Sequence, residues 1–408
     1  MHPDSAPACS RPRRAVGAAL AALLACLPPA AHASGTRVGF KDAFATGRGN
    51  AFVATADDPS AVYYNPAGLT QLEGAQFLGN IYDIAVSSDY SGPGGSTSMK
   101  DNYQAIPSFY ASWKMAGSPV AYGIGVYLPF GLSTEWPDNS PLRTFALRNT
   151  QKVITYNFSA AWQASPEFSV GAGLSYNHAT TDLRRAIGVF GPDDLFRFSG
   201  SGHSLGFDLG LLWKPSAEHS FGLSYTHHTS IKFDGVTDTI PLISGEPSNA
   251  TFEFPEVLIA GWSYRGVPQW NFEVNVDWTN WNRLDTVTIH KASGDTPLPF
   301  NWESGFFYEF GATRYFGGGW YASAGYCFTQ NSTPDATYTP AVPDSGRSFY
   351  SLGVGYKSDR FTADFAWQYG DGGTRHVTGS PPSLIGATAD GSYRNSLNGF
   401  SLSLGLRF

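Results

Sequence analysis

The sequence is poor in cysteine and has no long hydrophobic run, and each absence limits the fold. Of three cysteines in 408 residues, Cys9 and Cys26 precede the expected start of the mature chain, so Cys327 is the only thiol expected after processing. An intramolecular disulfide is therefore excluded. Beyond the N-terminus no stretch offers about 18 consecutive apolar residues, which excludes a protein that crosses a membrane with helices.

The first 33 residues have the pattern of a secretory signal peptide. Arginines at 11, 13 and 14 precede an apolar run over 15–27, and the small-residue stretch Ala31-His32-Ala33 follows. We expect the mature chain to begin near Ser34. A lipoprotein site at Cys26 is an alternative, which the bulky Leu24 disfavours because such sites prefer a smaller residue two positions before the cysteine.

Positive charge is also scarce. Leaving the three arginines and Asp4 of the leader out of 26 basic and 33 acidic residues, 23 basic and 32 acidic residues remain. This acidic balance argues against nucleic acid as a partner. We expect no enzyme, metal or cofactor: the sequence has no His-Glu-x-x-His motif, and the two histidines of its only pair, His227-His228, should point to opposite faces of a strand.

What the chain has in abundance is aromatic residues and glycine. It contains 11 Trp, 21 Tyr, 29 Phe and 46 Gly. A transmembrane β-barrel needs this mixture, with an apolar outer face, aromatic girdles and small or polar residues inside.

Many segments alternate between apolar and polar residues, as a strand with one apolar face requires. In residues 151–162, QKVITYNFSAAW, the side chains of Ile154, Tyr156 and Phe158 fall on one face, and those of Thr155 and Asn157 fall on the other. The same pattern recurs over 168–176, 205–213, 221–225, 270–278 and 400–408. A water-soluble β-sandwich would also alternate.

The spacing of the connections favours the barrel. Tight turns near residues 117, 165, 216, 266, 318 and 358 interleave with long loops near 90–103, 137–149, 185–202, 235–250, 291–301, 331–346 and 373–393. These 13 connections predict 14 antiparallel strands over residues 74–408. Because this number is even, the beginning of the first strand and the end of the last strand should both lie on the periplasmic side. Six tryptophans lie at the tight-turn ends, as an interfacial belt requires: Trp113, Trp162, Trp213, Trp262, Trp270 and Trp320.

Residues 34–73 precede the first strand and have no place in the wall. Their stretch DDPSAVYYNPAGLTQLEG is punctuated by proline and carries apolar side chains such as Val62, Tyr64 and Leu69. Because a barrel of 14 strands should enclose a lumen, we expect this segment to fill it as a hatch. The alternative is a periplasmic tail.

Several separated segments resemble the FadL family of outer-membrane long-chain fatty acid and hydrocarbon transporters. These are Gly39-Phe40 with ATADDPSAVYYNPAGLTQLEG, then LGFDLGLLWKPSAEHSFGLSYTHHTSIKFDG, FEFPEVLIAGWSYRGVPQWNFEVNVDWTNWNRL and FTQNSTPDATYTPAVPDSGRSFYSLGVGY. The resemblance implies a monomeric 14-stranded barrel and a hatch that includes Phe40, Asn65, Pro66 and Ala67. It also implies passive uptake of a hydrophobic molecule that leaves sideways through the wall.

The third predicted strand is interrupted by Pro129-Phe130-Gly131. Proline cannot donate a hydrogen bond to a ladder and is expected at edges or bulges. An ordinary bulge would explain it; the family places a lateral opening in its third strand, and on this resemblance these three residues are the expected exit.

The family takes up substrate between two outer loops, and apolar residues occur in both of the corresponding loops. The expected contacts are Val189, Phe190, Leu195, Phe196, Phe198, Ile240, Leu242 and Ile243, with Arg184 and Arg197, and also Arg185, as candidates for binding a carboxylate. A neutral hydrocarbon, alkane or monoaromatic, is the alternative substrate. A general porin, an outer-membrane lipid hydrolase and an adhesin are weaker alternatives.

The terminal Phe408 resembles the signal by which outer-membrane barrels are recognised for assembly. The expected location is therefore the bacterial outer membrane, and the expected partners are a hydrophobic ligand, outer-membrane lipid and lipopolysaccharide, and the barrel-assembly machinery.

Overall fold

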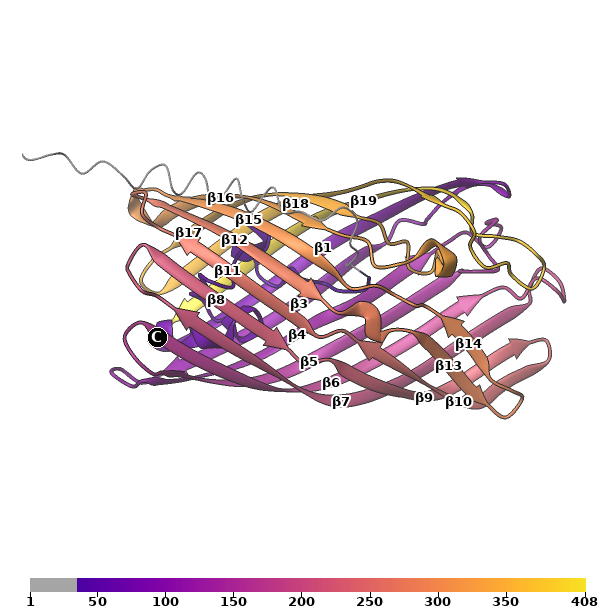
Figure 1. Cartoon of the computed structure of the whole chain (residues 1–408), viewed down its shortest axis with the longest axis horizontal. Helices are drawn as coiled ribbons and strands as arrows, with labels where there is room; N and C mark the ends of the chain where they lie inside the picture. Colours follow the sequence, from indigo (N-terminus) through magenta and orange to yellow (C-terminus); the bar gives the residue numbers. More distant parts are fainter. Residues whose placement is uncertain (1–34) are drawn as a thin grey trace, which may run out of the picture.

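The computed structural model describes residues 35–408, and these form a closed antiparallel β-barrel of 14 wall strands (Figure 1). The first and last strands, β1 (Gly74–Gly92) and β19 (Gly391–Arg407), pair with each other and close the wall. The predicted 14-stranded antiparallel barrel is thus confirmed. No helix within residues 35–408 is long and apolar enough to cross a membrane. The expected signal peptide, residues 1–33, lies outside the described residues.

The barrel is divided into 19 strand segments because four wall strands are interrupted and one short segment folds back on β1. The interrupted wall strands are β8 with β9, β10 with β11, β12 with β13, and β14 with β15. The remaining bounds are β2 (Gly95–Ser98), β3 (Tyr103–Lys114), β4 (Val120–Glu135), β5 (Arg148–Gln163), β6 (Phe168–Arg185), β7 (Leu195–Trp213), β8 (His219–Thr226), β9 (Thr229–Ile240), β10 (Ile243–Phe254), β11 (Val257–Tyr264), β12 (Trp270–Thr279), β13 (Thr286–Lys291), β14 (Thr296–Pro299), β15 (Gly305–Tyr315), β16 (Trp320–Thr329), β17 (Arg347–Lys357) and β18 (Phe361–Val377).

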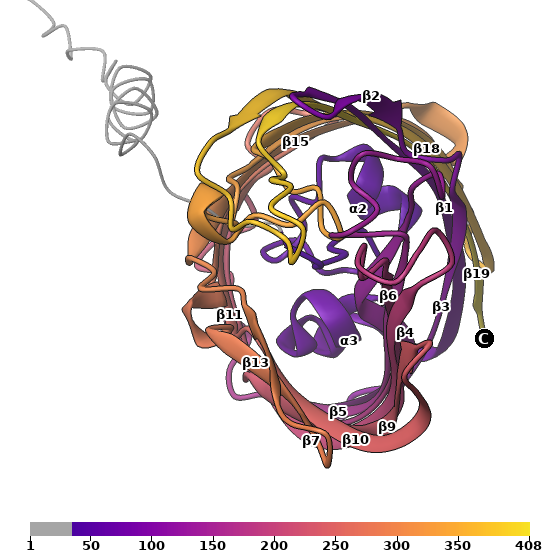
Figure 2. The ribbon, with the colours of Figure 1, turned by 90° about the vertical axis from the view of Figure 1, so that its right-hand side faces the viewer.

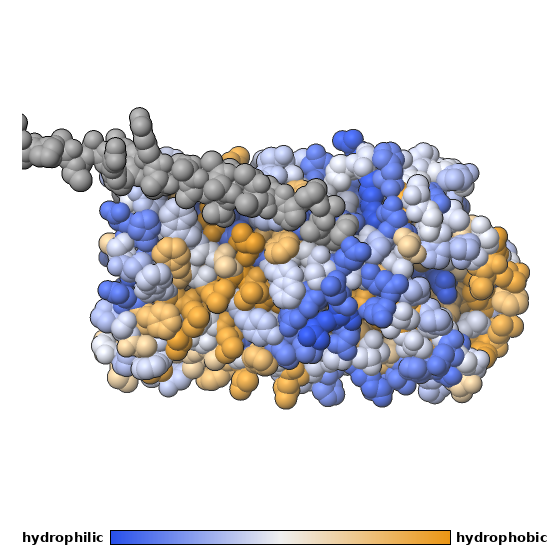
Figure 3. All heavy atoms as spheres, viewed as in Figure 1, coloured by the Kyte–Doolittle hydropathy of each residue, from blue (hydrophilic) through white to orange (hydrophobic). Residues whose placement is uncertain are grey.

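The predicted alternation places apolar side chains on the outside of the wall. In β5, Tyr156 and Phe158 are exposed, whereas Thr155, Asn157 and Ser159, which alternate with them, are buried toward the lumen. On the visible face of Figure 3, hydrophobic residues gather over the left half of the wall, hydrophilic residues lie to the right of the middle, and hydrophobic residues gather again at the right-hand end. Trp113, Trp162, Trp213 and Trp320 are exposed at the tight-turn end, as an interfacial belt requires.

All six predicted tight turns connect strands, but the loop predicted near 235–250 is an extended hairpin. β9 and β10 pair from Thr229 and Phe254 to Thr239 and Ile243. The Gly, Pro and Ser residues of this region suggested a loop. Strands that continue beyond the membrane into water, however, need no apolar face, and they keep their backbone hydrogen bonds to each other. For the same reason Leu195, Phe196 and Phe198 lie in β7 rather than in a loop.

Residues 35–73 lie inside the ring of strands (Figure 2). This N-terminal segment forms two short helices, α2 (Ala43–Gly47) and α3 (Ala61–Tyr64), and the 3-10 helix η1 (Pro66–Gln71). The Asn65 amide donates to the backbone carbonyls of Val53, in the segment, and Leu211, in the wall, at 2.8 and 3.0 Å. Asn65 therefore ties the segment to β7.

Two wall glycines allow this close approach. A Cβ atom at Gly171 would lie 2.4 Å from the Ala67 nitrogen, and one at Gly210 would lie 2.2 Å from the Asn65 side-chain oxygen. Any other residue at these positions would displace the Asn65-Pro66-Ala67 turn. Gly171 therefore belongs to the contact between the wall and the N-terminal segment.

Carboxylates that point inward from β12 and β15 bind polar side chains of the N-terminal segment. Arg37 donates to Asp277 at 2.6 Å, Arg48 lies 3.4 Å from Glu273, and Asn50 donates to Glu309 at 2.6 Å. Both ion pairs are almost completely buried. Removing one partner of a buried pair leaves an uncompensated charge and costs about 3–5 kcal/mol.

We predict that Gly171→Val displaces the N-terminal segment, because the new side chain occupies the position of the Pro66–Ala67 backbone. The expected result is a rise in ion conductance in planar bilayers with a barrel that still folds, as shown by heat-dependent migration in detergent gels. Gly317→Ala, where a Cβ meets nothing within 4 Å, is the control and should conduct like the wild type. An unchanged conductance for Gly171→Val would show that the segment does not block the lumen at this contact.

Candidate ligand path and binding site

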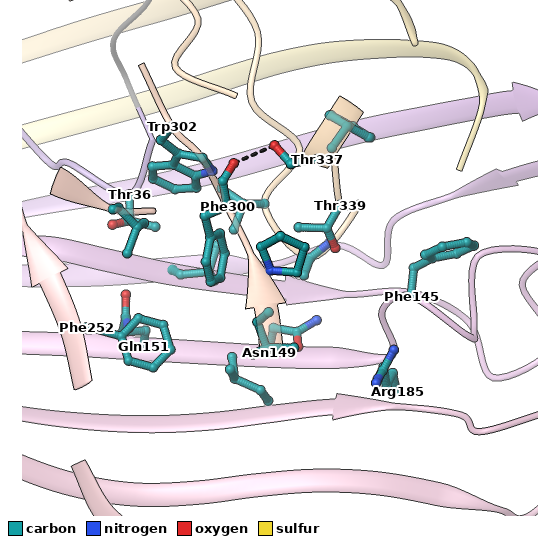
Figure 4. A pocket seen from close by; sticks show the side chains of 18 of the residues that line it. Thr36, Phe145, Asn149, Gln151, Arg185, Phe252, Phe300, Trp302, Thr337 and Thr339 are labelled. Atoms are coloured by element: carbon teal, nitrogen blue, oxygen red, sulfur yellow. Dashed lines mark hydrogen bonds between the residues drawn. The ribbon is translucent and has the colours of Figure 1, made fainter. Parts of the chain in front are cut away.

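An apolar cavity of about 230 Å³ lies near the end of the barrel that carries the long loops. Figure 4 shows side chains from β5, β10 and the loops before β15 and β17 converging on it. Aromatic and aliphatic side chains dominate its lining: Leu132, Leu183, Phe196, Phe252, Phe254, Trp281, Leu298, Phe300, Trp302 and Val342. We call this space the outer cavity. Such a lining suits an alkyl chain or an aromatic ring.

Among the arginines of residues 35–408 that line the outer cavity, Arg185 alone has no ionic partner for its guanidinium. It lies at the end of β6, half-buried, with its Cζ 5.1 Å from the centre of the Phe196 ring. Within residues 35–408 no hydrogen bond or ion pair joins its guanidinium to another side chain. A guanidinium in an apolar site can bind a carboxylate through two parallel hydrogen bonds.

The other two arginines are already paired. Arg184 and Arg197 both donate to Asp182, with distances of 2.7 to 3.0 Å. Arg197 also lies 3.7 Å from Asp238. Arg184 lines the outer cavity, but its charge is neutralised by Asp182. The sequence could not separate Arg185 from its neighbours, because the pairing depends on which side of β6 each arginine occupies.

The structure divides the apolar residues predicted for capture into two groups. Phe196 lines the outer cavity and Phe198 is fully buried, whereas Val189, Phe190, Leu242 and Ile243 are exposed and do not line the outer cavity. Leu195 and Ile240 face each other across the pairing of β7 with β9. The aromatic residues at 252, 300 and 302 were not predicted, because the segments that carry them are distant in the sequence.

A second cavity of about 460 Å³ adjoins the first, and four residues line both: Thr36, Leu132, Gln151 and Val342. We call it the inner cavity. Its lining includes Tyr82 and Ile106, which are buried, and also Phe109 and Tyr156, whose side chains are exposed on the outer face of the wall. The inner cavity therefore reaches from the lumen to the outside of the barrel.

The wall is incomplete where the inner cavity reaches it. β3 pairs with β1 along its whole length, but with β4 only from Phe109 and Val126 to Lys114 and Ala121. On its other side, β4 shifts register against β5 between Tyr127 and Phe130, which inserts one extra residue. The predicted interruption at Pro129 thus coincides with a bulge and with the end of the β3–β4 ladder.

The N-terminal segment covers this break from inside. The Val38 N–H donates to the Pro129 carbonyl at 2.8 Å, and the Gly131 N–H donates to the Thr36 carbonyl at 2.9 Å. The Phe130 ring turns into the core, 4.9 Å from Phe254 and 5.9 Å from Trp281. Two backbone groups that the bulge leaves without a ladder partner are therefore satisfied by the segment.

Residues 24–408 match the family model described as outer membrane protein transport protein (OMPP1/FadL/TodX). The chain belongs to this family. It is accordingly a protein of the bacterial outer membrane, and the family consists of transport channels.

Curated relatives and solved structures agree with the family assignment. The long-chain fatty acid transport protein of Escherichia coli O6:H1 is 22% identical, over 74% of this chain and 78% of the relative. Outer membrane protein P1 of Haemophilus influenzae is 22% identical, over 79% and 83%. The crystal structure of a Pseudomonas aeruginosa FadL homologue has a TM-score of 0.83 at 19% identity, covering 92% of this chain and 100% of that one, and the Ralstonia pickettii toluene transporter TbuX has a TM-score of 0.69 at 17% identity, covering 91% and 98%.

The sequence contains one motif that is typical of hydrolases. Gly202-His203-Ser204-Leu205-Gly206 has the Gly-x-Ser-x-Gly spacing of a nucleophile elbow. That motif requires a sharp turn between a strand and a helix, whereas these residues lie in the middle of β7 and pair continuously with β6. The spacing here results from glycine and serine alternating along a barrel strand.

The loop between β6 and β7 is organised by Asp194. Its carboxylate accepts the backbone N–H groups of Ile187, Gly188, Val189 and Phe190, at 2.8 to 3.0 Å. Desolvation of the carboxylate acts in the opposite direction, but these four bonds hold the pKa of Asp194 below its ordinary value. Asp194 therefore fixes the turn that presents Val189 and Phe190 to the exterior.

We predict that Asp194→Asn loosens this turn, because an amide accepts fewer and weaker N–H bonds than a carboxylate. Hydrogen exchange at residues 187–190 should become faster at pH 7. In the wild type the stabilisation is complete above the ordinary aspartate pKa of about 3.9 and is lost as the pH falls through the lowered value. Asp193→Asn, at the exposed neighbouring position, should leave exchange unchanged. Equal protection in both variants would contradict this role of Asp194.

Proposed function

We propose that the protein takes up long-chain fatty acids or similar hydrophobic molecules passively, and that the ligand passes through both cavities and leaves sideways between β3 and β4. The observation that carries this proposal is the continuity of the path. The outer and inner cavities share lining residues, and the inner cavity ends at the one break in pairing that coincides with Pro129, Phe130 and Gly131.

The energetics favour such a route. Burial of a methylene group is worth about 0.8 kcal/mol, so a long alkyl chain is more stable against apolar walls than in a water-filled pore. From the inner cavity it can enter the membrane through the break without crossing water. Net movement then needs only a concentration difference.

Arg185 supports a carboxylate as the polar end of the ligand. It is the unpaired guanidinium beside the apolar lining of the outer cavity. The E. coli relative is named a long-chain fatty acid transport protein, which agrees with this assignment. Structural neighbours include toluene transporters, so a neutral hydrocarbon is the alternative, and the test of Arg185 distinguishes the two.

The remaining parts of the molecule take supporting roles in this proposal. The N-terminal segment, with Phe40, Asn65, Pro66 and Ala67, acts as a hatch that keeps small solutes out of the lumen. The exposed Val189, Phe190, Leu242 and Ile243 collect the ligand at the outer surface. The protein acts as a monomer in outer-membrane lipid and lipopolysaccharide, and Phe408, which is exposed beside Phe77, is the assembly signal.

We predict that the double variant Pro129→Val with Gly131→Val abolishes uptake of a labelled fatty acid by cells while the barrel still folds. Two valines favour a regular strand and restore a backbone donor at position 129, so β4 can continue its ladder. The matched control is Pro247→Val, since Pro247 lies in the paired strand β10, and its uptake should equal that of the wild type. Normal uptake by the double variant would remove the lateral exit from the proposal.

We predict that Arg185→Gln weakens fatty acid binding roughly tenfold to a hundredfold, the value of a charge-assisted hydrogen bond of about 1.5–3 kcal/mol. Binding of toluene should be unchanged, because it has no carboxylate. Both are measured by titration of the purified barrel in detergent. The control is Arg148→Gln, an exposed arginine that lines neither cavity.

The pattern of these results identifies the ligand class. If Arg185→Gln changes the affinity for neither ligand and toluene binds more tightly than the fatty acid, the protein is a hydrocarbon channel and the carboxylate assignment is wrong. If neither ligand binds the wild type, the outer cavity is not the binding site.

A further inference from the structure

We propose that His227, His228 and Glu256 form a binding site for a divalent transition metal ion, with Zn²⁺ as the fitting case, on the outer face of the barrel wall. One ligand atom from each residue lies within 4.8 Å of the other two. The site is separate from both cavities of the proposed ligand path and does not depend on the proposed function.

The expectation that His227 and His228 point apart is wrong, because a bulge lies at this point of the wall strand. β7 pairs with β8 up to Asp208 and Thr226, and with β9 from Ser201 and Asp234 onward, and the register shifts by one residue between them. The extra residue breaks the two-residue period. His227 continues the outer face of β8 and His228 the outer face of β9, and the two ring centres lie 4.1 Å apart.

The third ligand comes from the same level of the neighbouring wall strand. β10 ends at Phe254 and β11 begins at Val257, so Glu256 lies in an interruption opposite the two histidines. The Tyr225 hydroxyl bridges the groups: it lies 3.1 Å from His227 Nδ1 and donates to Glu256 at 3.0 Å. Asn280 donates to the same carboxylate at 2.7 Å. These contacts orient the ligands as outer-shell partners do in metal sites.

One polar atom of the cluster has no partner in the part of the chain that the structure describes. His228 Nδ1 is shielded from solvent and makes no hydrogen bond within residues 35–408. A buried ring nitrogen without a partner is costly, and a metal ion would satisfy it.

The chemical types of the three ligand groups determine which ion fits the site. Two imidazoles and one carboxylate bind Zn²⁺ with a fourth position open, at distances of about 2.0–2.2 Å. Ligand atoms of a tetrahedral zinc lie about 3.4 Å apart at such distances, so the present separations of up to 4.8 Å must close by at most about 1.4 Å. Mg²⁺ and Ca²⁺ prefer oxygen ligands and should not bind. Arg283, 3.4 Å from Glu256, opposes any cation.

The position on the wall suggests a role in holding it together. Residues 226–229 and 254–257 interrupt two adjacent wall strands at the same level, where the regular ladder is lost. On the tight-turn side of the site lie the exposed Phe221 and Leu223, and on the long-loop side lies the exposed Lys232–Asp234 ion pair. The site thus lies at the edge of the apolar surface nearer the long loops, where a bound ion would link two wall strands across their interruption.

The test uses the full mature barrel without a histidine tag, purified in detergent and stripped of metal. Titration with Zn²⁺ should show one ion per chain and raise the thermal unfolding temperature, and Co²⁺ should give the visible absorption of a tetrahedral site. Each of His227→Ala, His228→Ala and Glu256→Gln should weaken Zn²⁺ binding at least tenfold. Arg283→Gln should strengthen it, which a purely structural role for the cluster would not predict.

The matched control is His290→Ala, because His290 and Asp295 form an exposed pair at 3.0 Å with no third ligand among residues 35–408. It should bind Zn²⁺ like the wild type. Where an alanine variant fails to fold, His227→Gln or His228→Gln replaces it. Absence of Zn²⁺ binding by the wild type, equal binding by the His227→Ala/His228→Ala double variant, or equal binding of Mg²⁺ would overturn the proposal.

Discussion

Pairing of the buried charges inside the barrel is the constraint on which the rest of the structure depends. Closing 14 strands leaves a lumen too wide for the wall's own side chains to fill, and β12 and β15 point Glu273, Asp277 and Glu309 into it. Carboxylates buried there need partners. Arg37, Arg48 and Asn50 of the N-terminal segment supply them, and this fixes where the segment lies.

The position of the N-terminal segment in turn determines how the bulge in β4 is stabilised. Arg37 is held by Asp277 and Thr279, and its neighbours Thr36 and Val38 are thereby positioned to bond the backbone at Pro129 and Gly131. The bulge would otherwise expose unsatisfied groups to an apolar environment, where each costs several kcal/mol. The same few residues therefore complete the break on the lumen side and line the inner cavity.

Charge pairing and apolar packing also arrange the side chains along the proposed ligand path. Asp182 and Asp238 pair with Arg184 and Arg197, which leaves Arg185 as the guanidinium beside the outer cavity that has no ionic partner within residues 35–408. Loops that are distant in the sequence contribute Phe300, Trp302 and Val342 to that cavity, whereas the exposed residues of the 186–194 loop are held outward by Asp194. The exposed loop residues and the outer cavity thus lie on different surfaces of the outer end.

The sequence by itself determined the wall. A period of two residues can place apolar side chains only on one side of a strand, so the strand count, the tight turns and the outward tryptophans followed from local pattern. Only the tertiary structure decided which arginine is free, where β3 leaves β4, which aromatic residues meet in the outer cavity, and that His227 and His228 share a face. The first three depend on contacts between residues far apart in the chain, and the last on a register shift against a neighbouring strand, which no local period contains.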